Sequence, residues 1–184
     1  MMARSVTFLV GLLTFLYPLA VYFGTQRFSP RVLSILLCFL LIVRLAMAGR
    51  YLNQPLILLG LAYAAFAALA NNIITLRYYP VMMNAALLLI FGFSLLQSTS
   101  FVERLARLQT PDLPPQGVLY TRRVTVVWCV FFLLNGGIAL TTALYATLEV
   151  WSLFNGLISY ILIGLLFAGE FLFRQRMFPS GISV

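Results

Sequence analysis

The stretch that decides the fold is Val124 to Leu148, VTVVWCVFFLLNGGIALTTALYATL, which carries no charged side chain over its whole length. About 20 predominantly apolar residues are enough for an α-helix to cross the hydrocarbon core of a bilayer. Only Glu149 and Val150 separate this stretch from a second long apolar run, Trp151 to Phe173. Two adjacent apolar runs with almost no loop between them predict an antiparallel pair of transmembrane helices.

The composition of the whole chain agrees with a membrane protein. Of its residues 62% are hydrophobic and only 9% are charged, whereas average soluble domains have about 25% charged residues. Such a chain lacks the polar side chains that would cover a water-soluble surface. We therefore predict an all-α polytopic transmembrane bundle with short loops, forming a single domain over residues 1–184, with six spans at about 6–23, 31–48, 55–76, 80–98, 124–148 and 151–173.

The connection between the fourth and fifth spans, at about residues 100–120, is long enough to have structure of its own. Phe101, Leu105 and Leu108 fall on one helical face, whereas Glu103 and the neighbouring arginines do not. This pattern predicts a short helix lying in the membrane interface. The prolines at positions 111, 114 and 115 break a helix, so an extended tether is expected after it.

The basic residues predict the orientation of the six spans. All 12 are arginines, and positive charge marks the cytoplasmic side of a membrane protein. Nine lie on the side that holds both termini, and the other three, Arg27, Arg31 and Arg77, lie on the opposite side. Both termini and the interfacial helix are therefore expected in the cytoplasm. The nine are Arg4, Arg44, Arg50, Arg104, Arg107, Arg122, Arg123, Arg174 and Arg176.

The net charge of +8 is spread over the segment ends, and the chain has no basic run. This distribution favours membrane lipids with anionic headgroups as partners and argues against nucleic acid. Cys38 and Cys129 lie inside apolar segments, where we expect them to act as small packing residues. Because the chain has no histidine, a histidine-dependent zinc site or general base is excluded. We predict no catalytic, cofactor-binding or metal-binding residues.

Two ionisable residues lie within predicted spans, Arg44 and Glu170. Charged groups at such positions are costly and often functional. Counting along the helices places both side chains at a similar depth near the cytoplasmic boundary, so they are candidates for an ion pair. The alternative is that Arg44 extends to the lipid headgroups and that Glu170 pairs with Arg174 one turn further on.

A second set of polar residues, Arg77, Asn84, Asn135 and Asn155, belongs to the outer half of the bundle. Amides within spans commonly form hydrogen bonds between helices. The sharper alternative is a polar cavity in which Arg77 meets an anionic headgroup. Separately, the small residues Gly60, Ala64 and Ala68 lie one helical turn apart, which permits either a homo-oligomer or close internal packing.

Several stretches of the chain resemble a known family: YTRRVTVVWCVFFLLN at Tyr120–Asn135, WSLFNG at Trp151–Gly156 and GEFLFR at Gly169–Arg174. They resemble an uncharacterised family of small bacterial membrane proteins, often encoded beside fatty-acid-synthase-like enzymes in clusters that make aryl polyene or xanthomonadin-type pigments. The chain is more distantly similar to the intracellular septation protein A family. The resemblance covers roughly residues 79–176. It implies a protein of the bacterial inner membrane in envelope or lipid biogenesis, and it supplies no catalytic residues.

Three functions follow from these patterns. The first is a non-enzymatic membrane component of envelope or lipid biogenesis that scaffolds cytoplasmic acyl-chain or polyene-synthesis enzymes. Its partner surface would attract an acidic acyl carrier protein or a synthase. The second is a small transporter or flippase for a lipid or a lipid-linked product. The third, an intramembrane transferase, is disfavoured because the few carboxylates are scattered. The candidate partner surface consists of Arg104, Arg107, Arg122 and Arg123.

Overall fold

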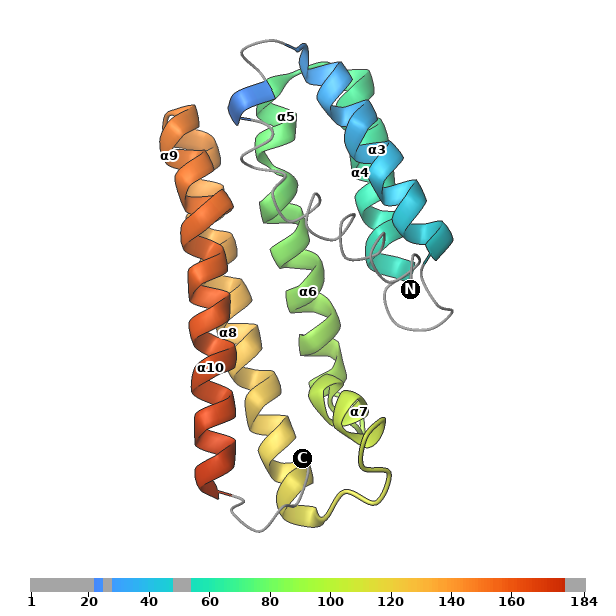
Figure 1. The fold of residues 1–184 in the computed structure, drawn as a ribbon, viewed down its shortest axis with the longest axis vertical. Helices are drawn as coiled ribbons and strands as arrows, with labels where there is room; N and C mark the ends of the chain where they lie inside the picture. The colour runs from blue at the N-terminus through green and yellow to red at the C-terminus, as the bar shows by residue number, and fades with distance from the viewer. Residues whose placement is uncertain (1–21, 25–27, 48–53, 178–184) are drawn as a thin grey trace, which may run out of the picture. The chain divides into compact units, whose positions relative to one another are not determined.

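A computed structural model describes residues 22–24, 28–47 and 54–177 of the chain. These residues form helices and no strand, which confirms the all-α prediction. Two compact units divide the chain: the first comprises Met1–Met83 and Ile138–Ser159, and the second Asn84–Gly137 and Tyr160–Val184. In chain order the helices of Figure 1 are α3 (Pro30–Met47), α4 (Gln54–Ala70), α5 (Ile73–Arg77), α6 (Tyr79–Leu95), α7 (Phe101–Arg107), α8 (Pro115–Tyr145), α9 (Leu148–Leu153), a π-helical turn (Phe154–Ile158) and α10 (Ser159–Met177).

Within the described residues, three helical stretches are long and apolar enough to cross a membrane: Ile73–Leu95, Pro115–Tyr145 and Leu148–Met177. Two shorter apolar stretches, Pro30–Val43 and Ile57–Ala70, belong to α3 and α4. These helices fit a membrane protein. The first predicted span, residues 6–23, lies outside the described residues except at its end, so the number of six spans stays a prediction.

The turn after α4 lies at Asn71 and Asn72, earlier than the predicted end of the third span. Asn71 has a positive φ of 47°, which asparagine adopts more readily than most residues. The Asn72 side chain then caps α5 by accepting a hydrogen bond from the Ile74 amide at 2.9 Å. The predicted connection at residues 77–80 is therefore wrong, because α5 and α6 together form one candidate span. Pro80 stands in the first turn of α6, where proline is tolerated.

Two other helix ends differ from the sequence predictions. Helix α8 begins at Pro115, so residues 115–120 are helical and the extended tether is shorter than predicted; proline suits the start of a helix. The hairpin after α8 closes at Ala146 and Thr147, and Thr147 Oγ1 accepts from the Val150 amide at 3.4 Å. Glu149 consequently lies in the first turn of α9, where the helix dipole favours a carboxylate. The prediction of almost no loop at this point is confirmed.

The core of the first unit joins α3 and α4, which lie side by side in Figure 1. Leu37 and Leu41 of α3 and Ala64 and Ala67 of α4 are buried in it. A Cβ atom added at Gly60 would lie 3.2 Å from Leu41 Cδ1, so a larger residue there would require the Leu41 side chain to shift. The small-residue face of α4 is thus used for close internal packing, one of the two alternatives expected from the sequence.

The core of the second unit is aromatic. The Phe91 ring of α6 lies 4.3 Å from the Phe101 ring of α7 and 5.1 Å from the Phe132 ring of α8, centroid to centroid. Trp128 of α8 lies 5.5 Å from Phe132 and 4.8 Å from Phe167 of α10. Ring pairs at these separations add to the stabilisation from buried area. Side chains from four helices therefore meet in one cluster.

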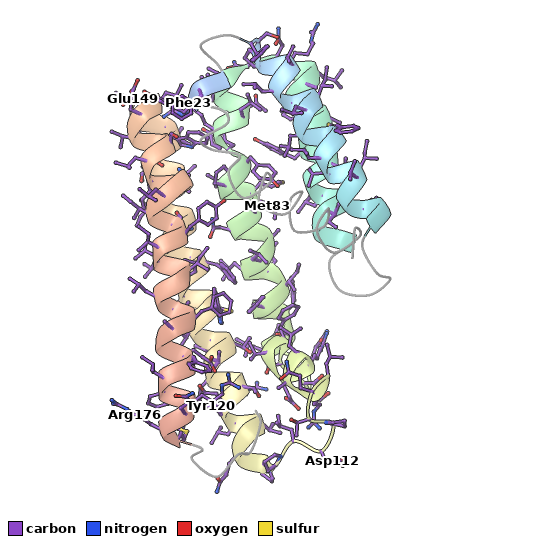
Figure 2. The ribbon with its side chains drawn as sticks, in the orientation of Figure 1. Phe23, Met83, Asp112, Tyr120, Glu149 and Arg176 are labelled. Carbon is purple, nitrogen blue, oxygen red and sulfur yellow. The ribbon has the colours of Figure 1, made fainter. Side chains whose placement is uncertain are left out.

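Polar and charged side chains gather at one end of the second unit. Asp112, Tyr120 and Arg176 all lie toward this end in Figure 2. The end is formed by α7, the start of α8 and the last turns of α10. Its arginines are Arg104, Arg107, Arg122, Arg123, Arg174 and Arg176.

Candidate functional site

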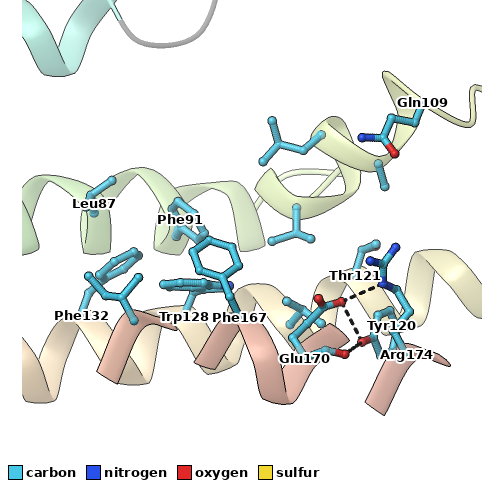
Figure 3. A pocket seen from close by; sticks show the side chains of 15 residues that line it. Leu87, Phe91, Gln109, Tyr120, Thr121, Trp128, Phe132, Phe167, Glu170 and Arg174 are labelled. Atoms are coloured by element: carbon cyan, nitrogen blue, oxygen red, sulfur yellow. Dashed lines mark hydrogen bonds and ion pairs between the residues drawn. The ribbon is translucent and has the colours of Figure 1, made fainter. Parts of the chain in front are cut away.

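A cavity of about 560 Å³ lies in the second unit, lined by residues of α6, α7, α8 and α10. Ligand sites in proteins commonly have volumes of about 300–1,000 Å³. We call this space the inner cavity. Figure 3 shows that aromatic side chains line one part of it and polar side chains another.

The aromatic wall of the inner cavity belongs to the cluster described above. It consists of Phe91, Trp128, Phe132 and Phe167. Phe91, Trp128 and Phe132 are buried, so their rings are held by their neighbours and leave a preformed apolar surface. An apolar group placed against this wall would be stabilised by the area it removes from water or from contact with polar groups.

The polar end of the inner cavity is organised around the carboxylate of Glu170. The Tyr120 hydroxyl donates to Glu170 Oε1 at 2.9 Å, and Arg174 Nε lies 3.3 Å from the same oxygen. Figure 3 shows these interactions at the opposite end from Phe132. The carboxylate therefore joins α8 to α10 and neutralises one arginine. Gln109, just after α7, adds an amide to this end.

Helix α7 closes the inner cavity with Val102, Leu105 and Ala106. Ser100 and Glu103 form a capping box at its start, which satisfies amides that a helix N-terminus otherwise leaves unpaired. Glu103 is buried, with 3% exposure, and accepts from Arg107 Nε at 3.0 Å. The capping box therefore holds the Glu103 side chain inward.

An amphiphile matches this arrangement better than a wholly apolar or wholly polar molecule. Its apolar body would contact the aromatic wall, and its head would meet the Tyr120 hydroxyl, the Glu170 carboxylate and the Arg174 guanidinium. These groups offer both donors and acceptors. Burial of the apolar part would supply most of the affinity and the polar groups the orientation.

The structure bears on only one partner of the candidate pair Arg44 and Glu170. Arg44 belongs to α3, but its side chain lies outside the described residues. Glu170 pairs with Arg174, which is the alternative that the sequence left open. The carboxylate has a further partner in the Tyr120 hydroxyl.

Arg77 holds together two helix ends in the first unit. Its Nη2 atom donates to the carbonyl oxygens of Thr142 at 2.7 Å and Ala146 at 2.5 Å. Its own carbonyl accepts from Trp151 Nε1 at 3.0 Å. The Thr142 carbonyl also accepts from the Ala146 amide at 3.2 Å. A cation is favoured beside the last carbonyls of a helix. Arg77 therefore serves as a cap for the end of α8.

Asn155 belongs to the π-helical turn of the first unit and is buried, with 4% exposure. Its amide Nδ2 donates to the Trp151 carbonyl at 2.9 Å and to Thr142 Oγ1 at 3.3 Å. Within the described part of the chain, its Oδ1 atom has no hydrogen-bond partner. The residue thus links α9 to α8 and keeps one unused acceptor.

Asn84 and Asn135 face each other across α6 and α8 in the second unit. Asn135 Nδ2 donates to Asn84 Oδ1 at 3.1 Å, as expected of amides that join two spans. A Cβ atom added at Gly136 would lie 3.0 Å from Asn84 Cβ. The glycine therefore allows the close approach that the amide pair requires.

Most of the candidate partner surface is bonded within the chain. Arg104 donates to the Gln97 and Thr99 side chains, Arg107 to Glu103 and the Pro111 carbonyl, and Arg122 to the Leu95 carbonyl at 2.7 Å. Arg123 is exposed. Among the described residues it forms no hydrogen bond or ion pair. The four arginines therefore share one end of the second unit without being equivalent.

Of the residues that line the inner cavity, only Glu170 was a candidate site residue from the sequence. Their spacing contains a signal, since Ile163, Phe167, Glu170 and Arg174 recur at helical intervals along α10. In an apolar span, however, every face is hydrophobic, so periodicity alone does not mark the inward one. The pattern that marks the inward face of α10 is a polar residue one helical turn away from an aromatic residue.

The described residues contain no group of three or more His, Cys, Asp or Glu side chains that could hold a metal ion. Comparison of the chain with protein-family models, curated proteins and solved structures found no match. The resemblance to the aryl polyene-associated and septation protein A families therefore stays a prediction. What the fold and the site define is a helical protein with membrane-length apolar helices and an amphipathic cavity.

Proposed function

We propose that this chain is a non-enzymatic membrane protein of envelope or lipid biogenesis that holds an amphiphile in the inner cavity. The observation that carries the proposal is the cavity of about 560 Å³ with an aromatic wall and a Tyr120–Glu170–Arg174 polar end. A lipid or lipid-linked product has the same division between an apolar body and a polar head. The protein would keep such a molecule at the membrane for enzymes that act on it.

The proposed setting is the bacterial inner membrane, with six spans and both termini in the cytoplasm. The distribution of nine arginines against three supports this orientation. Helix α7 and the polar end of the second unit then lie at the cytoplasmic boundary, where the interfacial helix was expected. An amphiphile held there has its head within reach of soluble enzymes.

A role in binding rather than catalysis agrees with the use of the carboxylates. Glu103 is bonded into the capping box and to Arg107, and Glu170 is bonded to Tyr120 and Arg174. A general base needs a carboxylate free to take a proton from a substrate. Both side chains instead stabilise helix ends and helix contacts.

The test is the identity of the molecules that purify with the full-length protein. Mass spectrometry of the extracted lipids should show an amphiphile enriched over the surrounding membrane. Ala106→Phe fills the inner cavity from α7 and should reduce that enrichment strongly. The matched variant Leu108→Phe enlarges an exposed residue just beyond α7 and should leave it unchanged. Equal retention by wild type and Ala106→Phe contradicts the proposal.

Scaffolding is the part of the proposal that concerns protein partners. Arg104 is exposed and bonded only to surface side chains, so charge reversal leaves the core intact. We expect Arg104→Glu to reduce co-purification of an acyl carrier protein or synthase, because an acidic partner would be repelled. Arg176→Glu, on α10, is the comparison variant. Unchanged recovery with Arg104→Glu rejects the scaffold.

Cysteine labelling tests the orientation. In a variant without the native cysteines, Glu149→Cys should react with a membrane-impermeant maleimide on intact cells. Asp112→Cys should react only after the membrane is permeabilised. The reverse pattern, or labelling of both positions in intact cells, contradicts the proposed topology.

A second candidate function, transport of a lipid or lipid-linked product, is favoured by the π-helical turn at Phe154–Ile158. This turn interrupts the candidate span Leu148–Met177, and π-helical turns are frequent at functional sites. The unused Oδ1 atom of buried Asn155 lies in it. Reconstituted protein should then speed lipid flipping above empty liposomes, and Asn155→Ala should slow it. A rate equal to that of empty liposomes rejects transport.

A further inference from the structure

A second space in the second unit, of about 320 Å³, lies along α8 and α10. We call it the outer groove. Val127, Leu165, Leu166 and Phe173 give it apolar walls, and Arg123 lies among its lining residues. Tyr120, Val124, Trp128 and Glu170 line both the outer groove and the inner cavity. These four residues therefore separate the two spaces.

The depth of the outer groove depends on Gly169. A Cβ atom added at this glycine would meet no heavy atom within 4 Å, so the groove is open above the α10 backbone. Leu165 and Phe173, one turn before and one turn after it, are largely exposed and line the groove as well. Large apolar side chains before and after a glycine on α10 thus border an open space of about 320 Å³.

Arg123 gives the outer groove an available positive charge. Two other arginines of α8 and α10 are engaged, Arg122 with the Leu95 carbonyl and Arg174 with Glu170. The Arg123 guanidinium has no such partner among the described residues and is exposed. Guanidinium groups bind phosphate oxygens through paired hydrogen bonds. An apolar channel beside a free arginine matches a phosphate group attached to a hydrocarbon chain.

We propose that the outer groove binds an anionic phospholipid, with one acyl chain above Gly169 and the phosphate paired with Arg123. The occupant is a membrane lipid rather than free phosphate because α8 and α10 are both candidate membrane spans, so the groove faces acyl chains. This site is distinct from the inner cavity. It rests on the membrane placement of α8 and α10, and it would stand if the inner cavity held no amphiphile.

Native mass spectrometry of the full-length protein in detergent, titrated with phosphatidylglycerol or phosphatidylcholine, measures this binding. Wild type should bind phosphatidylglycerol more tightly than phosphatidylcholine. Arg123→Gln should weaken phosphatidylglycerol binding about fivefold, as expected for one arginine near a lipid surface, and should bring the two lipids to similar affinity. Arg176→Gln removes another exposed charge, on α10 and outside the groove, and should change neither affinity.

Two further measurements separate the acyl chain from the headgroup. Gly169→Leu fills the groove and should remove most binding of both lipids, whereas Gly164→Leu, at another glycine of α10 with open space around it, should not. Inorganic phosphate should not compete. The proposal is overturned if wild type binds both lipids equally, if Arg123→Gln and Arg176→Gln behave alike, or if phosphate alone displaces the lipid. Arg123→Gln alters an exposed side chain. Its result therefore tests the proposed phospholipid site even if Gly169→Leu does not fold.

Discussion

The two units place buried and half-buried polar groups against different partners. In the first unit, Arg77 and Asn155 donate to backbone carbonyls of Thr142, Ala146 and Trp151. In the second unit, Tyr120 and Glu170 bind each other at the edge of a cavity. The polar groups of the first unit bind backbone carbonyls near helix ends, whereas those of the second unit lie beside the inner cavity.

This difference separates stability from ligand binding. A polar side chain that satisfies backbone carbonyls within an apolar span removes a penalty of several kcal/mol, of the order that each unsatisfied group costs there. A polar side chain at a cavity edge contributes less to folding but can exchange its partner for a ligand. We therefore expect substitutions in the first unit to change mainly stability and those at the inner cavity to change mainly what is bound.

The largest effect is expected at Arg77. Arg77→Leu removes the hydrogen bonds to the carbonyls of Thr142 in α8 and of Ala146 just after it. Each involves a charged donor, so the substitution should lower the free energy of unfolding by about 3 kcal/mol. Thermal unfolding of the purified protein in detergent measures the loss. Arg176→Gln, at an exposed position, is the control. An unchanged Tm for Arg77→Leu would contradict the expectation that substitutions in the first unit change mainly stability.

The next effect distinguishes adjacent glycines of the second unit. Alanine at position 136 would place its Cβ against Asn84 Cβ, whereas alanine at position 137 would meet nothing within 4 Å. Gly136→Ala should cost about 1 kcal/mol through steric strain, and Gly137→Ala should gain up to about 1 kcal/mol through helix propensity. The opposite order of their Tm values would show that α6 and α8 do not approach closely at Gly136.

Sequence patterns were sufficient for the helical class and for most long helices. Apolar length predicts α3, α8 and the stretch that ends in α10, because these spans have no competing signal. It places the turn after α4 wrongly, since Pro80 and the tyrosines before it resemble a loop. The decisive feature was the backbone preference of two consecutive asparagines, Asn71 and Asn72, for a turn and a helix cap.

The candidate site was less predictable, because it depends on pairs far apart in the chain. Glu170 stands out as a charge within a span, and its ion pair with Arg174 follows from helical spacing. Its bond to Tyr120 connects residues on different helices, whose rotation about their axes cannot be read from uniformly apolar sequences. The same limit hid the aromatic wall around Trp128.

A smaller effect on stability is expected from Tyr120→Phe. The substitution removes one hydrogen bond to Glu170 and should cost about 1 kcal/mol, measured as a shift in Tm. Tyr120→Phe should reduce amphiphile retention more strongly than it reduces stability, because the hydroxyl also lies at the polar end of the inner cavity. A variant that lost stability as Arg77→Leu does, yet retained the amphiphile fully, would assign Tyr120 to the structural class seen in the first unit.

The smallest effect is expected for the amide pair of the second unit. Hydrogen bonds between membrane helices average about 0.6 kcal/mol, because the unfolded chain in the membrane also finds partners. A double-mutant cycle with Asn84→Ala, Asn135→Ala and the double variant should give a coupling of that size. The cycle isolates the pair from the other contacts of each residue. A coupling near 3 kcal/mol would mean that the second unit, too, depends on a polar contact of structural strength, and that the division between the two units is one of position only.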